Sequence, residues 1–312
     1  MIQTIDKAAL IDYLVSLELV SLAFRDKLIN NPYGPVALRK DTDLGYRSMQ
    51  LFIELGEPLG TYTLNGFTAR VVEFPKYTHV VSQHISTAEL EERMAAVNWQ
   101  KDAYKILNGI PNPVDMLFND ALFLRLVGNK QARDIVDILL LKYCDGTPAM
   151  NMLSHNPYEH PFVKTMTVEL NGDVRDLSLS QTWNLLEGRA VLKLNIPGDK
   201  ESAAWYRYNG TSLDKFPAFD LLAVLSGVPV SSRPGYEWRV SLYRKLINGD
   251  QVPLKIKAEH GKNITVALEV VPAGSCLVGT GSNGNTFRFD RPAVDTKQVQ
   301  ATRKNKRKGR SL

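Results

Sequence analysis

The chain has 312 residues, of which 44% are hydrophobic and 23% charged, with a formal net charge of +5. This is the composition of a globular protein with a sizeable core, and no apolar run reaches the roughly 18 residues that a membrane helix needs. The N-terminus lacks the pattern of a signal peptide, and Cys144 and Cys276 lie far apart in the chain, so the sequence excludes a disulfide framework and favours a cytoplasmic location.

Residues 1–150 are predicted to form a mostly helical domain with one β-hairpin. Apolar side chains recur every three or four residues over 5–29, which predicts a helix, and a second helix is expected over 43–55. The pattern then changes to a two-residue alternation near 61–74. The Asn65-Gly66 pair within it is typical of a tight hairpin turn, because both residues accept a positive φ.

The longest helical region is expected over 84–104, where Ser86 and Glu89 form a capping box ahead of an apolar stripe. Two further helices are predicted over 114–126 and 129–143. The irregular segment that follows them is the predicted domain boundary, since it contains no periodic pattern.

Residues 163–292 are predicted to form a second domain, so that the chain as a whole belongs to the α+β class, with antiparallel strands in its C-terminal half. The expected strands are 165–170, 190–195, 203–208, 251–258, 263–271, 275–279 and 285–290, and the expected helices are 179–187, 218–226 and 236–247.

The segment 175–193 reads as a folding unit. Ser178 stands three residues before Gln181, a spacing at which the two can cap a helix start reciprocally. Gly188 occupies the position where a left-handed C-terminal cap is needed. Only Arg189 is left without a structural role, and we expect it to bind a helix-end carbonyl or an acid.

Three patterns suggest chemistry, and none has the context that the chemistry requires. "GTGSNG" at 279–284 matches a dinucleotide-binding fingerprint but precedes a strand pattern, so a glycine-rich hairpin is expected and no cofactor is predicted. His155, Glu159 and His160 lie in a loop broken by prolines, at a spacing unlike that of helical zinc sites, so no metal is predicted.

Nucleophilic catalysis is not predicted either. Ser275, next to Cys276, is expected to lie in a buried strand, and no nucleophile elbow, phosphate-binding loop or acid pair is present. We therefore expect a protein that is not an enzyme, with an unrecognised site around His155–His160 as the remaining enzymatic alternative.

The C-terminal segment 297–312, called the basic tail below, contains seven positive charges and no acid. Outside it, 31 basic residues face 33 acidic ones, so the rest of the chain has a net charge of −2. Such a tail cannot bury itself, so it is predicted to be disordered and to contact the phosphates of a nucleic acid without sequence preference. The predicted nucleic-acid-binding residues are Arg303, Lys304, Lys306, Arg307, Lys308 and Arg310.

The motifs "ELEERMAAVNWQKDAY", "ARDIVDILLLKYCDGTP", "LSLSQTWNLLEGRAVLK" and "FDLLAVLSGVPV" occur in this order. Together, over roughly residues 88–312, the chain resembles an uncharacterised family, a domain of unknown function, found on bacterial conjugative transposons, plasmids and related mobile elements. Cys144 departs from the aromatic residue of that family. The resemblance implies a role in DNA mobility, supplies no catalytic residue and leaves residues 1–85 without a role.

The sequence thus predicts a non-enzymatic, nucleic-acid-associated accessory protein of a mobile genetic element or phage. Its basic tail would contact phosphates while the folded body binds a protein partner or a second copy. The alternative is a structural, assembly or protein-interaction component, for example of a virion, whose tail meets an acidic partner.

Overall fold

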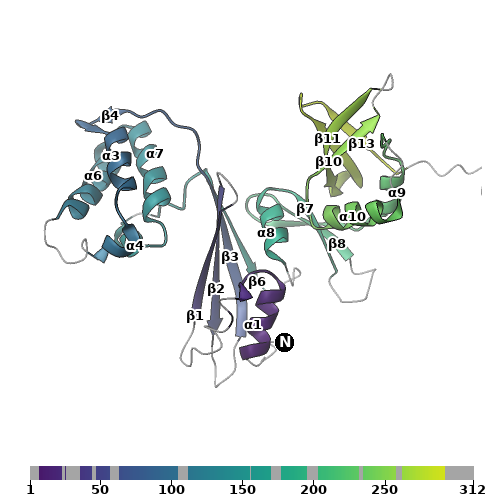
Figure 1. Cartoon of the computed structure of the whole chain (residues 1–312), viewed down its shortest axis with the longest axis horizontal. Helices are drawn as coiled ribbons and strands as arrows, with labels where there is room; N and C mark the ends of the chain where they lie inside the picture. The colour runs from purple at the N-terminus through teal and green to yellow at the C-terminus, as the bar shows by residue number, and fades with distance from the viewer. Residues whose placement is uncertain are drawn as a thin grey trace, which may run out of the picture. The chain divides into compact units, whose positions relative to one another are not determined.

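The computed structural model describes residues 7–22, 25, 36–43, 47–56, 63–104, 112–154, 156–169, 177–194, 203–231, 235–257 and 262–291 (Figure 1). The chain divides into two compact units. The larger comprises Met1–Asp41, Gln50–Arg70 and Thr165–Leu312, and the smaller, called the helical unit below, comprises Thr42–Met49 and Val71–Lys164.

The chain is of the mixed α+β class, as the sequence predicts. Helix α1 (Lys7–Ser16) precedes a four-stranded sheet with the strand order β1-β2-β3-β6. The strands are β1 (Val36–Asp43), β2 (Arg47–Gly56), β3 (Thr63–Glu73) and β6 (Val163–Glu169).

The helix predicted over 43–55 is wrong, because strand β2 occupies most of this segment. Met49, Leu51 and Ile53 are all buried, and they recur at a two-residue spacing that places them on one face of a strand. A short apolar run of this kind is ambiguous in sequence, and pairing with neighbouring strands decides its conformation. The helix predicted over 5–29 is also shorter in the structure, where α1 ends at Ser16.

The hairpin turn predicted at Asn65-Gly66 is also wrong, since both residues lie inside the single strand β3. Phe67, Ala69 and Val71 continue the alternation beyond them and are buried. The ladder of a long strand outweighs the local turn preference of the two residues, as expected for a preference that depends on context.

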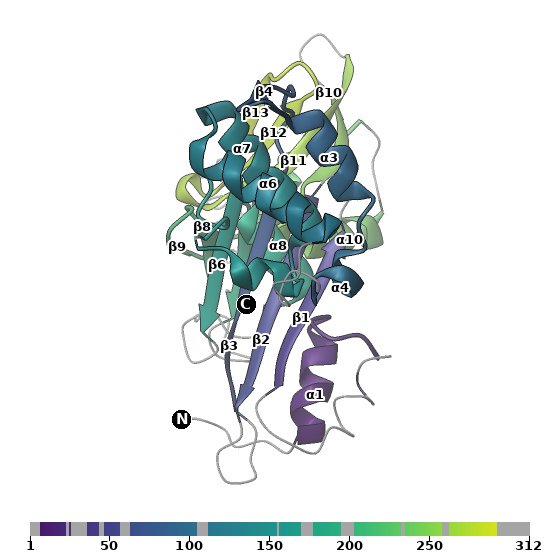
Figure 2. The ribbon, with the colours of Figure 1, turned by 90° about the vertical axis from the view of Figure 1, so that its left-hand side faces the viewer.

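The helical unit contains three helices that pack against one another, α3, α6 and α7 (Figure 2). Their shared core includes Leu90, Met94, Phe118, Leu124 and Leu139. The elements are β4 (Val81–Ser82), β5 (Ile85–Ser86), α3 (Thr87–Ala95), α4 (Trp99–Asp102), α6 (Pro113–Val127), α7 (Lys130–Leu139), the π-helix η1 (Leu140–Cys144) and the 3-10 helix η2 (Pro148–Met152).

The predicted helices of this unit are confirmed at α6 and α7, whereas the one over 84–104 begins later and is interrupted. A short β4–β5 pair precedes it, and α3 ends at Ala95 before α4 begins at Trp99. Ser86 is the N-cap residue, as predicted, and its hydroxyl accepts a hydrogen bond from the Glu89 amide.

The C-terminal elements follow the predicted order, with one strand missed, β9. They are α8 (Leu179–Leu186), β7 (Ala190–Leu194), β8 (Ala203–Tyr208), β9 (Leu213–Pro217), α9 (Leu221–Ser226), α10 (Tyr236–Ile247), β10 (Val252–Lys257), β11 (Asn263–Val271), the 3-10 turn η5 (Pro272–Gly274), β12 (Cys276–Gly281) and β13 (Thr286–Phe289).

These strands form two antiparallel sheets, β7-β8-β9 and β10-β11-β12-β13. The register pairs Leu254 with Val266, both buried, so they share the face that packs on α9 and α10 (Figure 1). Trp205 of β8 is fully buried in the same core and stacks on Phe219 at 5.6 Å between ring centroids. The core of this region therefore joins both sheets to both helices.

Gly249, directly after α10, is a position where the fold requires glycine. Its φ is +86°, and a Cβ atom there would lie 2.9 Å from the Ala190 carbonyl oxygen and 2.9 Å from the Asn184 Cβ. We expect Gly249→Ala to lower the free energy of unfolding by about 2 kcal/mol, since a backbone strain and a collision combine. Gly210 has a φ of +99° but open space around it, so Gly210→Ala should cost only about 1 kcal/mol. Urea unfolding of both variants measures the difference, and equal losses would contradict the close packing at Gly249.

Candidate functional site

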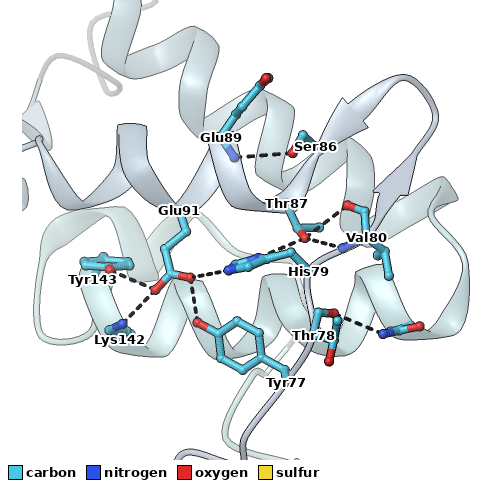
Figure 3. Close-up of polar contacts among 11 residues, drawn as sticks. Tyr77, Thr78, His79, Val80, Ser86, Thr87, Glu89, Glu91, Lys142 and Tyr143 are labelled. Carbon is cyan, nitrogen blue, oxygen red and sulfur yellow. Dashed lines mark hydrogen bonds and ion pairs between the residues drawn. The ribbon is translucent and has the colours of Figure 1, made fainter.

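The densest group of polar side chains among the described residues surrounds Glu91, on helix α3 of the helical unit (Figure 3). Tyr77 donates a hydrogen bond to Glu91 Oε2 at 2.7 Å, and His79 Nε2 lies 3.3 Å from the same oxygen. Lys142 Nζ donates to Glu91 Oε1 at 2.7 Å, and the Tyr143 hydroxyl donates to it at 3.1 Å. Each carboxylate oxygen thus contacts two side chains. We call Glu91, Tyr77, His79, Lys142 and Tyr143 the Glu91 cluster.

Thr87 extends the cluster toward the backbone of the segment before β4. Its buried hydroxyl accepts from the Val80 amide at 2.9 Å and donates to the Val80 carbonyl at 3.1 Å. The other ring nitrogen of His79, Nδ1, lies 3.2 Å from the same hydroxyl (Figure 3). The extended segment that contains Tyr77 and His79 is therefore held against α3 at both its side chains and its backbone.

The π-helix η1 explains how two consecutive residues, Lys142 and Tyr143, reach one carboxylate oxygen. Consecutive side chains of an α-helix point about 100° apart, because a turn takes 3.6 residues. The wider turn of a π-helix reduces this angle, and such turns recur at functional sites. The π-helix also keeps Leu140, Leu141 and Cys144 buried on the opposite side.

The contacts within the cluster keep Glu91 and Lys142 charged and Tyr77 and Tyr143 neutral at neutral pH. Burial raises the pKa of the Glu91 carboxyl, but the hydrogen bonds from Lys142 and Tyr77 outweigh it and leave that pKa below its usual value. The hydrogen bond to Glu91 raises the pKa of Lys142. Burial, with the Glu91 contact second, raises the pKa of Tyr77, and burial also raises that of Tyr143.

The arrangement is consequently a clamp with a carboxylate, an ammonium ion and two neutral phenols. A general acid or base needs a pKa near the working pH, whereas these shifts move the pKa values of Glu91, Lys142 and both tyrosines away from neutrality. The cluster ties together three stretches of the helical unit, namely the segment at 77–80, helix α3 and the π-helix. Sequence reasoning missed it, since a single glutamate on a helix carries no motif.

The loop proposed as an enzymatic alternative is only partly described, because His155 lies outside the described residues. Glu159 accepts a hydrogen bond from the side chain of Asn156, and the His160 ring contacts the tilted ring of Phe162, with 4.0 Å between the centroids. His160 Nε2 lies 3.7 Å from Asp134. Over the described part of the chain, no group of three or more His, Cys, Asp or Glu side chains is close enough to hold a metal ion.

Both cysteines are buried. Cys144 belongs to the core of the helical unit, where burial raises the pKa of its thiol. Cys276 lies in β12, but the prediction that Ser275 shares a buried strand is wrong: Ser275 is exposed and adopts a left-handed conformation, with φ of 48°, after the turn η5.

The "GTGSNG" segment forms the hairpin between β12 and β13, as predicted. Its Gly284 has a φ of 80° and the Gly284 amide donates to the Gly281 carbonyl at 2.9 Å. A helix does not follow this segment, so the phosphate-binding context of the fingerprint is not formed.

The capping box predicted in the segment 175–193 is confirmed, with Ser178 and Gln181 bonded reciprocally, and Gly188 has the expected positive φ of 74°. The Gly188 carbonyl at the helix end accepts a hydrogen bond at 2.7 Å from Arg207 on strand β8. Arg189, which we expected to bind a helix-end carbonyl or an acid, lines a surface hollow beside α8 and α10.

The predicted nucleic-acid-binding residues Arg303 to Arg310 lie outside the described residues, as does the whole basic tail. Among the described residues, no helix is both long enough and apolar enough to cross a membrane.

No protein-family model matches the chain, and comparisons with curated proteins and with solved structures found no match. The resemblance to the mobile-element family therefore rests on the sequence motifs alone.

Proposed function

We propose that the chain is a non-enzymatic, nucleic-acid-associated accessory protein of a mobile genetic element or phage, acting in the cytoplasm. The basic tail contacts phosphates, and the folded body binds a protein partner or a second copy. The observation that carries this proposal is the segregation of charge: seven bases and no acid in 297–312, against a net charge of −2 in the rest of the chain. A polyanion is the natural ligand of such a tail.

The character of the Glu91 cluster supports a non-enzymatic role. The Glu91 carboxylate contacts four neighbouring side chains. These contacts favour its charged form and lower its pKa. A clamp of this kind stabilises a folded body, and it leaves the interaction with nucleic acid to other parts of the chain.

The proposal is tested by replacing the six bases of the tail, Arg303 to Arg310, with glutamine and measuring affinity for a labelled duplex and a single strand. Loss of binding in the neutralised chain supports the proposal, and unchanged binding contradicts it.

Removal of residues 297–312 is expected to leave the thermal unfolding transition within about 1 °C of that of the full chain. The apolar residues of the tail are Val299, Ala301 and Leu312, too few to contribute a core, so its loss should remove little buried surface. Differential scanning calorimetry of the 1–296 chain measures this, and a large drop in the transition temperature would show that the tail packs against the body.

The alternative function, a structural, assembly or protein-interaction component, is favoured by helix α6. Met116, Phe123, Leu126 and Val127 are all exposed, with Leu126 at 79%, and their spacing places them along one stripe of the helix. Apolar residues gathered on one exposed stripe are typical of protein interfaces. A stable homo-oligomer with little nucleic-acid binding would favour this alternative.

A further inference from the structure

Two shallow hollows lie on the surface of the larger unit, beside helix α10. One, of about 340 Å³, lies between α8, the turn at Arg189 and the start of β10. The other, of about 360 Å³, follows α10 from Tyr236 to Asn248. Lys245 lines both, so the two hollows are neighbours, and we call them together the α10 groove.

The floor of the α10 groove is fixed by polar contacts and close packing. The Asn184 amide donates to the Asn248 carbonyl at 2.7 Å and to Asp250 Oδ1 at 2.9 Å. Gln181 donates to the Asn248 side chain at 3.1 Å. The tight approach at Gly249 joins the end of α10 to α8 and β7, so the groove has a defined shape before any ligand binds.

The charges along the α10 groove favour an anion. Arg189, Arg244 and Lys245 line it, and the latter two are exposed in the last turn of α10. Two acids, Glu237 and Asp250, also line it, so three basic and two acidic side chains leave it a net charge of +1. Arginine and lysine side chains presented together bind phosphate by charge-assisted hydrogen bonds.

Aromatic rings stand in both hollows. Tyr236, at the start of α10, is 82% exposed, the largest exposed fraction among the exposed large hydrophobic side chains described. Trp183 is half-buried and lines the other hollow. Aromatic rings beside basic side chains are the usual combination in single-strand binding. The nucleobases stack on the rings, and the phosphates contact the arginine and lysine side chains. A duplex keeps its bases stacked inside and cannot use these rings.

We propose that the α10 groove binds a short stretch of single-stranded nucleic acid, with phosphates at Arg189, Arg244 and Lys245 and bases stacked on Trp183 and Tyr236. This inference rests on the proposed function and deepens it, because it assigns the folded body a preference for single strands that the basic tail, which has no aromatic residue, cannot supply. The basic tail contacts the phosphates of duplex and single-stranded nucleic acid alike, and the α10 groove binds only the single strand.

The charge component is tested in the full chain with the double variant Arg244→Glu/Lys245→Glu. Affinity for labelled oligothymidylate is expected to fall about ten-fold, and the salt slope to become shallower by about 1.4, the loss of two phosphate contacts on a single strand. The matched control is Lys101→Glu/Arg133→Glu, which makes the same charge change at two exposed positions of the helical unit. Equal losses of affinity in the two double variants would mean that only the net charge of the chain matters. That result would overturn the proposed binding in the α10 groove.

The stacking component is tested with Tyr236→Ala, which removes little buried surface because the tyrosine is largely exposed. Affinity for oligothymidylate should fall about five-fold or more, while affinity for a duplex stays unchanged. Tyr104→Ala, at a 55% exposed tyrosine of the helical unit, is the control and should bind normally.

The two proposals fail in different ways. If the full chain binds neither a duplex nor oligothymidylate, both the proposed function and the groove inference are contradicted. If the full chain binds both, and Tyr236→Ala and the groove double variant bind like the unmodified protein, only the groove inference is overturned. Ultraviolet crosslinks from oligothymidylate to Trp183 or Tyr236 would support it, and crosslinks confined to the basic tail would contradict it.

Discussion

Glu91→Ala is expected to lower the free energy of unfolding of the helical unit by about 3 kcal/mol. The substitution leaves the Tyr77 and Tyr143 hydroxyls and the Lys142 ammonium ion without their common acceptor, and unpaired groups of this kind carry their desolvation cost. Loss of a partner from a buried pair costs about 3–5 kcal/mol, and we take the low end because Lys142 is 42% exposed and water screens it. Chemical unfolding followed by circular dichroism measures the change.

Glu92→Ala is the matched control for this substitution. Glu92 is the next residue on the same helix and is exposed, so its removal should cost less than about 0.5 kcal/mol. If the two variants unfold alike, the Glu91 cluster contributes nothing beyond ordinary helix propensity.

The Glu91 cluster should make the stability of the helical unit depend on pH. The pKa of Glu91 is lowered in the folded state, so its contribution is present above the ordinary glutamate pKa of about 4.3 and is lost as the pH falls through the lower folded value. The pKa of Lys142 is raised, so its contribution is present below about 10.4 and is lost only as the pH rises further. The stability difference between the unmodified chain and Glu91→Ala should therefore shrink in acid, below about pH 4, and persist at neutral pH.

The second large effect is expected at the basic tail. Replacing Arg303, Lys304, Lys306, Arg307, Lys308 and Arg310 with glutamine should weaken binding to a duplex at least about 100-fold at 50 mM salt, because up to six phosphate contacts and their released counterions are lost. The rest of the chain has a net charge of −2, so it adds no overall attraction for a duplex.

A tail of the same length and composition but scrambled order is the control for this variant. Phosphate contact carries no sequence information, so the scrambled tail should bind as tightly as the natural one. Loss of binding on scrambling would point instead to recognition of a defined peptide by a protein partner.

Local signals in the sequence predicted much of the C-terminal region. The Ser178–Gln181 capping box, helix α10 and the "GTGSNG" hairpin depend on caps, a 3.6-residue period and glycine turns, and each of these is a short-range effect. The same reasoning failed where strand pairing within a sheet decides the outcome. Strand β2 was expected to be helical, and the Asn65-Gly66 pair of β3 was expected to turn. Both strands lie inside the sheet β1-β2-β3-β6, where pairing with a strand on each side outweighs the local preference of the segment.

The candidate sites also divide into those that a local sequence pattern reveals and those that it does not. The Glu91 cluster joins residues up to 66 positions apart in the chain, from Tyr77 to Tyr143, so no local motif announces it. The partner of the Gly188 carbonyl proved to be Arg207, on a strand that follows, which spacing could not indicate. The basic tail is the opposite case, because its charge is visible in the sequence alone.

The measurement that tests the central claim most directly is the affinity of the full chain and of the 1–296 chain for a labelled duplex and a single strand, from 50 to 200 mM salt. The account predicts that the full chain binds with a salt slope of up to about −5 on the duplex, the value for six phosphate contacts. It also predicts that the 1–296 chain loses nearly all duplex binding and keeps a weak, shallow-sloped affinity for the single strand. Equal duplex binding by the two chains, or no binding by either, would contradict a role for the basic tail in nucleic-acid contact.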